Sequence, residues 1–364
     1  MALHTIQTSG YQILLGDIFS QLDEYLRKYD YSQYLVFLDD NTCEYCFPVL
    51  LEKLPEWAEV FQPVVIKSGE EQKNLETCRS LWHKMTSAGA DRNTLVINLS
   101  GGVLSDMGGF VASTYKRGVH FINLPTTLLS MVDASVGGKL GIDFYGLKNH
   151  IGLFANPHGV FIYPGFLKTL PNRELLSGFA EVVKHSLIAD KDYFKRISQF
   201  GDPNTFTEEQ WEKMIASSVE IKKQVVEKDP REAGLRKVLN FGHSLGHAVE
   251  SWSFSSNWPL LHGEAIAAGM IMELYLSTLK TGLTQSQLDQ LTNYLLNTFP
   301  YYDEFVNSNA KDILEFIKQD KKNRSHRTLM TLLRETGDAE YDIDVSDFEV
   351  LEAIAFYKNL KKEI

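Results

Sequence analysis

The strongest constraint on the fold of this chain is a change of pattern near residue 164. Before this point, short apolar runs alternate with longer amphipathic stretches, which is typical of βα units in a mostly parallel sheet. After Pro164, apolar residues recur at intervals of three and four, and runs typical of strands become scarce. We therefore predict an α/β domain with a mostly parallel sheet over residues 1–164 and an all-α domain over 165–364.

Five segments are predicted to form the strands of the sheet, namely 34–40, 63–69, 94–102, 120–125 and 159–164. The first three end in polar or glycine-bearing turns, and open α/β sheets bind ligands at the carboxyl ends of their strands. The segment PGFLKTLP (164–171) is the expected boundary, because its two prolines disfavour helix in the residues before them. We expect a small-molecule site in a cleft where the two halves pack together.

Composition excludes several classes of protein. The 364 residues are 44% hydrophobic and 23% charged, as in an ordinary globular protein, whereas the net charge of −11 argues against a nucleic-acid or anionic-membrane partner. A bilayer span needs about 18 apolar residues, and no run approaches this length; the start also lacks the pattern of a signal peptide, so we expect a cytoplasmic protein. Among Cys43, Cys46 and Cys78, the CxxC pair has no second such pair, which favours a structural role over redox or metal chemistry.

A glycine-rich segment, GGVLSDMGG (101–109), follows one predicted strand and leads into a helix-compatible stretch. Glycines in such a turn let backbone N–H groups approach a pyrophosphate, although the strict GxGxxG pattern is absent and the turn alone is weak evidence. Polar residues near other strand ends support a dinucleotide site, and the alternative for each is helix capping or turn formation. They are Asp39, Asn41, Glu70, Lys73, Thr126 and Thr127.

The helical half carries a pattern of metal ligands. In GFAEVVKHSLI, Glu181, Lys184 and His185 share one helix face. His243 and His247 in NFGHSLGHAVE lie four residues apart, so one helix can offer two ligands, and His262 stands where a further helix should begin. A carboxylate and imidazoles suit Zn²⁺ or a similar divalent ion. The spacing favours His243 and His247 as joint ligands and leaves open which residues complete the shell.

Cationic and amide side chains flank these motifs in spite of the acidic total. Most lysines are solvated, but their recurrence within small or apolar stretches predicts convergence on an anionic substrate with two separate anionic groups, such as a phosphate and a carboxylate. The residues are Arg117, Lys139, Lys148, Asn149, Lys222, Arg236 and Asn240.

Taken in order from about residue 35 to 335, these motifs resemble the 3-dehydroquinate synthase family. The resemblance is carried by SGEEQKN, GGVLSDMGGFVASTYKRG, LPTTLLSMVDASVGGKLGID, LKNHIG, SGFAEVVKH, LRKVLNFGHSLGHAVE and LLHGEAIAAGM. It implies an NAD-binding α/β domain, an all-helical metal domain with Zn²⁺ or Co²⁺, and usually a homodimer. It also implies conversion of 3-deoxy-D-arabino-heptulosonate 7-phosphate to 3-dehydroquinate and phosphate, the second step of the shikimate pathway. The implied route is transient oxidation by NAD, phosphate elimination, reduction, ring opening and intramolecular aldol closure.

The resemblance also implies roles for residues. The implied metal ligands are Glu181, His243 and His262, with His247 on the substrate side. The implied NAD contacts are Asp39, Asn41, Glu70, Lys73, Gly102, Val103, Leu104, Ser105, Asp106, Thr126, Thr127, Lys139, Lys148, Phe166, Leu167, Lys168 and Thr169. The implied substrate contacts are Asp133, Lys139, Asn149, Lys184, Lys222, Arg236, Asn240 and His247, a basic residue within 320–327, and Arg117, which resembles an arginine that reaches toward the partner subunit's site.

One departure from the family pattern is Ser100, which stands where the family usually begins a triple glycine. Two other functions are to be weighed against a cyclase. A metal-dependent alcohol or polyol dehydrogenase would also need nucleotide glycines and helix-borne histidines, but it has no use for so many cations. A binding protein without activity would not need intact metal and basic positions.

Overall fold

The computed structural model describes residues 3–145, 147–302, 305, 308–319 and 328–360. The chain forms two compact units: unit 1 comprises Met1–Pro171 and Thr207–Lys223, and unit 2 comprises Asn172–Phe206 and Gln224–Ile364. This division follows Pro171, a few residues after the boundary expected from the sequence, and it assigns most of the long helix α8 (Glu208–Lys228) to unit 1.

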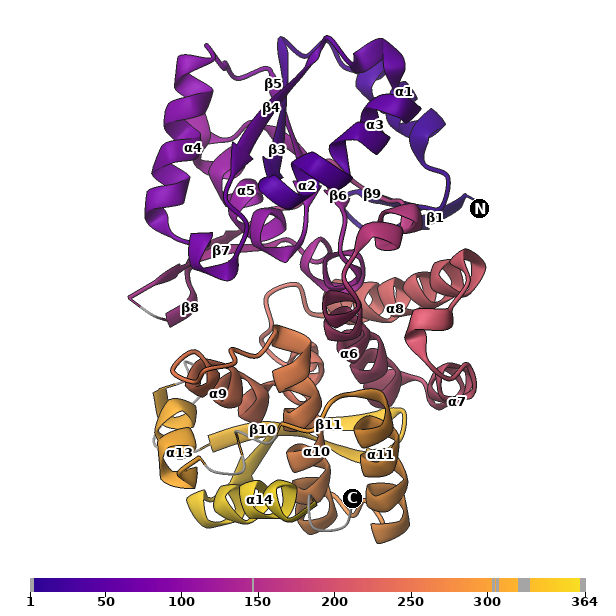
Figure 1. Cartoon of the computed structure of the whole chain (residues 1–364), viewed down its shortest axis with the longest axis vertical. Helices are drawn as coiled ribbons and strands as arrows, with labels where there is room; N and C mark the ends of the chain where they lie inside the picture. Colours follow the sequence, from indigo (N-terminus) through magenta and orange to yellow (C-terminus); the bar gives the residue numbers. More distant parts are fainter. Residues whose placement is uncertain (1–2, 146, 303–304, 306–307, 320–327, 361–364) are drawn as a thin grey trace. The chain divides into compact units, whose positions relative to one another are not determined.

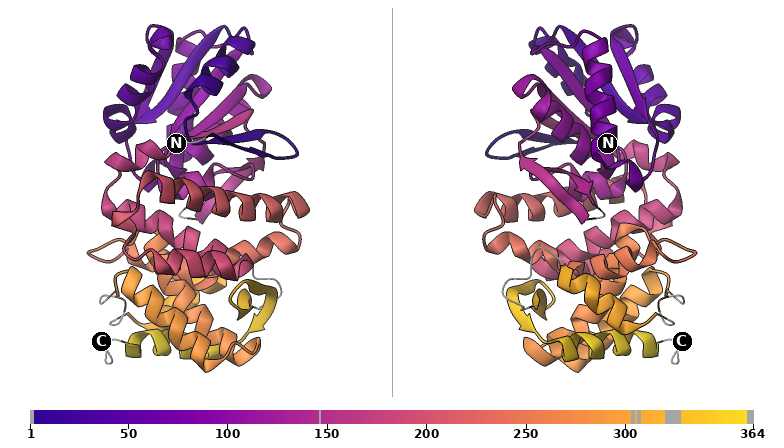
Figure 2. Two further views of the ribbon diagram at one scale, coloured as in Figure 1. Left: turned by 90° about the vertical axis from the view of Figure 1, so that its right-hand side faces the viewer. Right: turned by 90° about the vertical axis from the view of Figure 1, so that its left-hand side faces the viewer.

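Unit 1 is built on a seven-stranded sheet with the strand order β1-β2-β9-β6-β5-β3-β4. All neighbouring strands are parallel except β1 and β2, which form an antiparallel hairpin. Figure 2 shows this hairpin as the indigo loop that extends from one edge of the sheet. The strands are β1 (His4–Gln7), β2 (Gln12–Leu15), β3 (Gln33–Asp39), β4 (Phe61–Ile66), β5 (Thr94–Ser100), β6 (His120–Pro125) and β9 (Gly159–Ile162).

Helices cover both faces of this sheet. Figure 1 shows α4 and α5 on one side and α1 and α3 on the other. The α4 and α5 side chains pack on Leu35, Phe37 and Val96 of the sheet, and the same core includes Leu140 and Ile142 of a second hairpin. The helices are α1 (Phe19–Lys28), α2 (Asp40–Tyr45), α3 (Phe47–Lys53), α4 (Leu75–Ser87) and α5 (Gly102–Thr114), and the second hairpin is β7 (Lys139–Phe144) with β8 (Leu147–Phe154).

Unit 2 is mainly helical, with α10 at its centre. Almost every residue of α10 from Gly263 to Ser277 is buried, because α6, α9, α11 and α14 pack around it. The helices are α6 (Asn172–Ala189), α7 (Lys191–Gln199), α9 (His243–Ser253), α10 (His262–Lys280), α11 (Gln285–Thr298), α13 (Ala310–Gln319) and α14 (Asp347–Asn359). Among the described residues, no helix in either unit is long and apolar enough to cross a bilayer.

The fold class expected from the sequence is confirmed, with one addition. Unit 2 contains an antiparallel hairpin, β10 (Thr328–Glu335) with β11 (Asp338–Val345), in the region expected to be entirely helical. It is the yellow pair of strands in Figure 1. Gly337 turns the chain there with a φ of +92°, a conformation that glycine adopts without a Cβ penalty. The buried Met330, Leu332 and Leu333 anchor the hairpin in the core of unit 2.

Candidate active site

The glycine turn of unit 1 lies at the carboxyl end of the buried strand β5. β5 ends at Ser100, and α5 begins at Gly102. A Cβ on Gly101 would lie 3.0 Å from Cγ2 of Thr127, so glycine allows the turns that follow β5 and β6 to come together. The Thr126 N–H donates to the Ser100 carbonyl at 3.0 Å, and the buried Ser100 is therefore compatible with this turn. Gly101, the N-cap, has no side chain to occupy the first N–H groups of α5, which suits a pyrophosphate.

Lys73 is held firmly beside this turn. Its side chain is buried, and Nζ donates to Oδ2 of Asp106 on α5 at 2.6 Å. Burial alone would lower the pKa of the Lys73 ammonium, but the Asp106, Glu70 and Asp143 carboxylates outweigh this and raise the pKa above its ordinary value. Glu70 also lies 3.4 Å from the ammonium of Lys148. Two predicted NAD contacts, Lys73 and Asp106, thus form one ion pair, in which the Lys73 side chain is buried and the Asp106 side chain is 19% exposed.

Breaking this pair should have a measurable cost. Replacing Lys73 by Met leaves the Asp106 carboxylate without its cation, so the free energy of unfolding should fall by about 3 kcal/mol. The affinity for NAD⁺ should fall as well if Lys73 serves the dinucleotide. Urea unfolding and an NAD⁺ titration measure the two effects. The double variant Lys73→Met with Asp106→Asn should recover part of the stability; a double variant no more stable than Lys73→Met would contradict the pairing.

Several other predicted NAD contacts take part in local structure, as a helix cap or within a turn. Asp39 caps α2, since its carboxylate accepts from the Thr42 N–H at 2.7 Å, and Asn41 is exposed on the same helix. Thr127 and Ser130 exchange hydrogen bonds through their hydroxyls and backbone N–H groups. The segment Phe166–Thr169 lies on a 3₁₀ turn (Pro164–Thr169). For Asp39 the capping interpretation therefore applies, and a contact with NAD remains a prediction.

Residues predicted to contact the substrate occur in three parts of unit 1. Lys222 of α8 is buried; its Nζ donates to the Asp133 carbonyl at 2.6 Å and also forms an ion pair with the Asp133 carboxylate. Lys139 begins β7, and Asn149 of β8 has a φ of +49° while its N–H donates to the Asp143 carboxylate at 2.7 Å. Arg117 is exposed at the end of a 3₁₀ turn (Tyr115–Arg117), with a φ of +72°.

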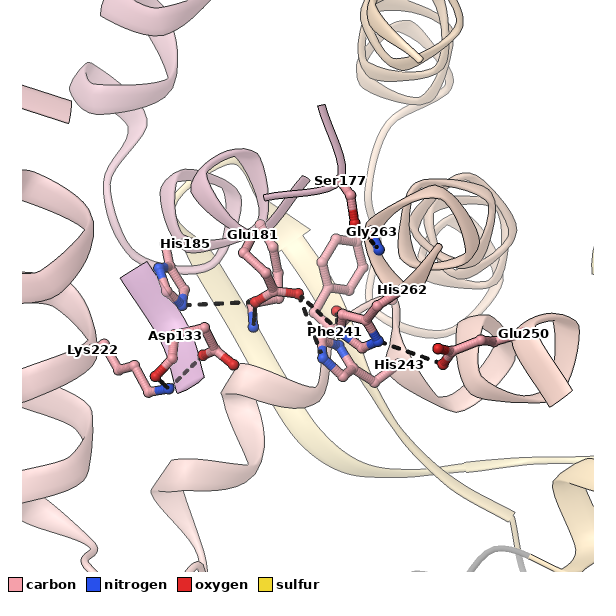
Figure 3. Close-up of polar contacts among 12 residues, drawn as sticks. Asp133, Ser177, Glu181, His185, Lys222, Phe241, His243, Glu250, His262 and Gly263 are labelled. Atoms are coloured by element: carbon pink, nitrogen blue, oxygen red, sulfur yellow. Dashed lines mark hydrogen bonds and ion pairs between the residues drawn. The ribbon is translucent and has the colours of Figure 1, made fainter. Parts of the chain in front are cut away.

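In unit 2 three predicted metal ligands converge (Figure 3). Oε1 of Glu181 on α6 lies 3.5 Å from Nε2 of His243 on α9 and 3.8 Å from Nε2 of His262 on α10. Tetrahedral ligands about 2.1 Å from one Zn²⁺ ion lie roughly 3.4 Å apart. Within the described part of the chain, neither carboxylate oxygen of Glu181 accepts a hydrogen bond, although Lys184 forms an ion pair with Oε2. A fully buried carboxylate facing two imidazole nitrogens fits a divalent metal ion.

The opposite nitrogens of both imidazoles are held by the protein. Nδ1 of His243 is 3.1 Å from the Phe241 carbonyl, and Nδ1 of His262 is 3.4 Å from Oε2 of the buried Glu250. Metal-binding histidines almost always donate their second N–H to such an acceptor, which fixes the tautomer and directs the other nitrogen to the ion. Here that arrangement leaves Nε2 of both rings facing Glu181.

Close contacts at two glycines bring the three helices together. A Cβ on Gly263 would lie 1.8 Å from the Ser177 carbonyl oxygen of α6, and one on Gly269 would lie 2.0 Å from the Gly242 carbonyl oxygen beside α9. The Gly263 N–H also donates to Oγ of Ser177 at 3.0 Å. The starts of α9 and α10, which carry His243 and His262, are thereby held near Glu181.

His247 belongs to the same cluster. One nitrogen of each of His243, His247 and His262 lies within 4.8 Å of the others, so a three-histidine site is also geometrically available. The spacing-based pairing of His243 with His247 is therefore a real alternative. We favour Glu181, His243 and His262 because Nε2 of His243 and Nε2 of His262 both face the same carboxylate oxygen, Oε1 of Glu181.

Two further residues of unit 2 that are predicted to contact the substrate, Lys184 and Arg236, are buried. Lys184 is 1% exposed and Arg236 is 2% exposed, which is rare for cations and costly without anionic partners. Nη1 of Arg236 donates to the Pro230 carbonyl at 2.8 Å. Hydrogen bonds from the Gly234, Ala233 and Arg236 N–H groups hold the pKa of Asp229 below its usual range. The predicted basic residue within 320–327 lies outside the described residues.

Sequence reasoning missed several residues that shape the site. Glu232 adopts a φ of +58°, and its Oε1 accepts from Nδ2 of Asn240 at 2.8 Å. Asp229 and Glu250 were also missed. Glu250 follows His247 by three residues on α9, so its place on the histidine-bearing helix was a usable signal.

Glu250 offers a direct test of the metal site. Glu250→Gln should lower the affinity for Zn²⁺ by about tenfold to a hundredfold, because the acceptor of the His262 N–H loses its charge. Competition with a chelator measures this affinity, and melting of the metal-free protein serves as the control for folding. Unchanged Zn²⁺ affinity would show that His262 does not bind the ion.

Comparison with known proteins identifies the family of this chain. The family model for the 3-dehydroquinate synthase N-terminal region matches residues 63–177, and the model for the C-terminal region matches residues 178–323. The chain belongs to the 3-dehydroquinate synthase family. The 3-dehydroquinate synthase of Parabacteroides distasonis is 40% identical over 348 residues, which are 95% of this chain and 97% of that protein.

Solved structures of related enzymes share the fold of this 3-dehydroquinate synthase family member. The 2-epi-5-epi-valiolone synthase of Streptomyces hygroscopicus, solved with NAD⁺ and Zn²⁺, is 25% identical with a TM-score of 0.84, covering 99% of this chain and 100% of its own. A 2-deoxy-scyllo-inosose synthase complexed with carbaglucose-6-phosphate, NAD⁺ and Co²⁺ is 23% identical with a TM-score of 0.86, covering 97% and 99%.

Proposed function

We propose that this chain catalyses the reaction of its family. It converts 3-deoxy-D-arabino-heptulosonate 7-phosphate to 3-dehydroquinate and phosphate, as a phosphorus–oxygen lyase in the shikimate pathway. The observation that carries the proposal is the convergence of the Glu181 carboxylate with the imidazoles of His243 and His262, in a chain that matches family members over almost its full length.

The proposed cofactors are NAD and one divalent ion, Zn²⁺ or Co²⁺. When bound, NAD⁺ supplies a reversible acceptor for the hydride of a substrate alcohol, and the metal ion supplies a Lewis acid that polarises the substrate oxygen. Glu181, His243 and His262 would hold the ion. The turn at Gly102–Asp106, with Lys73 and Thr127, would hold the dinucleotide; a glycine N-cap and a buried cation support this assignment.

The chain's own side chains would bind and orient the substrate. Arg236 and Asn240 would bind the carboxylate, while Lys139, Asn149 and His247 would bind the phosphate. Lys222 would present an ammonium held by the Asp133 carbonyl and carboxylate, and Lys184 would do so from its ion pair with Glu181. Fixing both ends of a flexible substrate lowers the entropy cost of each later step, above all of ring closure. The buried cations favour this doubly anionic substrate over that of a polyol dehydrogenase.

One assay tests the proposal. The purified protein is incubated with the heptulosonate phosphate, Zn²⁺ or Co²⁺, and NAD⁺ at a small fraction of the substrate concentration. We expect equal amounts of phosphate and 3-dehydroquinate, many turnovers per NAD⁺ and no net NADH. Accumulation of NADH in proportion to substrate consumed, without phosphate release, would instead identify a dehydrogenase, and no turnover at all would identify a binding protein.

We further infer a homodimer and a cytoplasmic location. Arg117 supports the first inference, because it resembles an arginine that reaches toward the partner subunit's site, and its side chain is exposed on a 3₁₀ turn (Tyr115–Arg117). If so, mixing Arg117→Ala with a second inactive variant in another site residue should restore activity in mixed dimers. A monomer in analytical ultracentrifugation would contradict the inference.

A further inference from the structure

Glu273 lies in the middle of α10, on the helix that begins with His262, and it is fully buried. Its carboxylate reaches the start of the neighbouring helix α9. Oε2 accepts from the Gly242 N–H at 2.5 Å, and Oε1 accepts from the Leu245 N–H at 3.1 Å. One carboxylate of α10 thus binds the first turn of α9, the turn that carries His243.

This contact replaces an ordinary helix cap. The N-cap residue of α9 is Gly242, with a φ of +80° and no side chain to accept an N–H. N-terminal N–H groups of a helix need acceptors from elsewhere when the helix start is buried. Glycine is required at 242 by packing as well, since a Cβ there would lie 2.6 Å from Cγ of Met270 and 3.1 Å from the Ile266 carbonyl oxygen. Glu273 supplies the acceptor that Gly242 cannot.

Two consequences follow for the cation site. First, the Glu273 carboxylate fixes the register between α9 and α10, and so the separation of His243 from His262. Second, the positive end of the α9 dipole lies at His243, where it opposes a bound cation, and a carboxylate at this end offsets that partial charge. A residue that only stabilised the helices would set the separation of His243 from His262, but it would not offset the positive end of the α9 dipole.

We propose that Glu273 is a positioning residue of the metal site, which sets the place of His243 and offsets the positive end of its helix. The proposal rests on the proposed function in one respect, namely that His243 and His262 bind the ion. It adds a residue that contacts neither metal nor substrate. Because Glu273 acts on the start of α9, loss of the Glu273 charge weakens metal binding even when no substrate is present.

The test uses the full-length protein and the variant Glu273→Gln. The amide keeps the shape but places an N–H donor group against one of the two backbone N–H groups. We expect the Zn²⁺ affinity, measured by chelator competition, to fall by about tenfold to a hundredfold. The visible absorption spectrum of the Co²⁺-loaded protein should shift, and the NAD⁺ affinity should stay at the wild-type value. Glu273→Asp, which keeps the charge but shortens the reach, should recover part of the Zn²⁺ affinity.

The matched control is Glu349→Gln. Glu349 also accepts an N–H at a helix start, that of Ser346 at 2.8 Å before α14, but this helix carries no predicted ligand. The Zn²⁺ affinity of Glu349→Gln should equal that of the wild type. Wild-type affinity and an unchanged Co²⁺ spectrum in Glu273→Gln would overturn the proposal while leaving the proposed function intact. Wild-type Zn²⁺ affinity in His243→Ala would instead overturn the metal assignment itself.

A measurement on the unaltered protein covers the case in which Glu273→Gln does not fold. The Leu245 amide, in the first turn of α9, donates to Glu273 and should exchange its hydrogen slowly even in the metal-free protein. Slow exchange supports the role of Glu273 in ordering this turn. Rapid exchange in the metal-free protein, with protection only after Zn²⁺ is added, would overturn it, because the ion and not Glu273 would then order the turn.

Discussion

Replacing Glu181 by Gln is expected to abolish metal binding and to reduce kcat/KM by at least about a thousandfold, equivalent to roughly 4 kcal/mol of transition-state stabilisation. The carboxamide is nearly isosteric but lacks the charge that would face a cation together with Nε2 of His243 and His262. His262→Ala should give the same loss. Metal content of the purified variants and phosphate release measure the two effects.

The control for this prediction is Glu212→Gln. Glu212 is also a buried carboxylate close to an imidazole, 2.6 Å from Nε2 of His4, but it belongs to unit 1. The Glu212→Gln variant should retain both the metal ion and the activity. Because Glu181→Gln leaves Lys184 without its partner, some loss of thermal stability is expected, whereas circular dichroism should show an intact fold. Full turnover in a verified metal-free variant would contradict the role of Glu181.

Replacing Arg236 by Ala is the second large effect that we expect. Its guanidinium is buried, so a substrate carboxylate bound there would lose a charge-assisted pair shielded from water. We expect kcat/KM for the heptulosonate phosphate to fall by about a hundredfold, or roughly 3 kcal/mol, mainly through weaker binding and orientation. Steady-state kinetics with phosphate detection measures the change.

Two comparisons separate this role from damage to the loop. A substrate analogue that lacks the carboxylate should lose little in Arg236→Ala, because its binding does not use the guanidinium. Arg236→Lys should keep part of the activity, because lysine retains the charge. It loses the bidentate geometry of the guanidinium and the hydrogen bond to the Pro230 carbonyl. Equal losses for the substrate and the analogue would show that Arg236 serves the fold of residues 229–236 instead.

The parallel sheet could be predicted because buried strands appear as continuous apolar runs. The segments predicted at 34–40, 94–102 and 120–125 correspond to β3, β5 and β6, with ends that differ by at most two residues. The larger differences fall at carboxyl ends, where residues of the following turn or helix were counted as strand. The residues after β5 are glycine and apolar as well, so periodicity does not separate them from the strand before them.

The hairpins could not be predicted in the same way. β1 and β2 are only four residues each, and β8 has only exposed or half-buried residues, of which four are polar or glycine. Such strands are stabilised by pairing with neighbouring strands, and not by a local apolar run. β11 was missed for the same reason, since it is rich in aspartate and mostly exposed or half-buried. β10, in contrast, is an apolar and mostly buried run that was included in the predicted helical half.

For the candidate site, the sequence predicted the chemistry better than the pairing of residues. The interval between His243 and His247 is visible on one helix, whereas the approach of Glu181 to His243 and His262 depends on contacts among α6, α9 and α10 at Gly263 and Gly269. Before the structure, only the family resemblance indicated Glu181, His243 and His262 as the ligand set. Glu250 and Glu273 act across helices as well, so no periodicity within one helix reveals what their carboxylates bind.

Anomalous diffraction from crystals grown with Zn²⁺ and NAD⁺ tests the central claim most directly. Data on both sides of the zinc absorption edge should show one strong peak in unit 2, at bonding distance from Oε1 of Glu181 and from Nε2 of both His243 and His262, with His247 outside that distance. A peak bound by His243, His247 and His262 without Glu181, or no peak at these residues at full Zn²⁺ loading, would contradict the account.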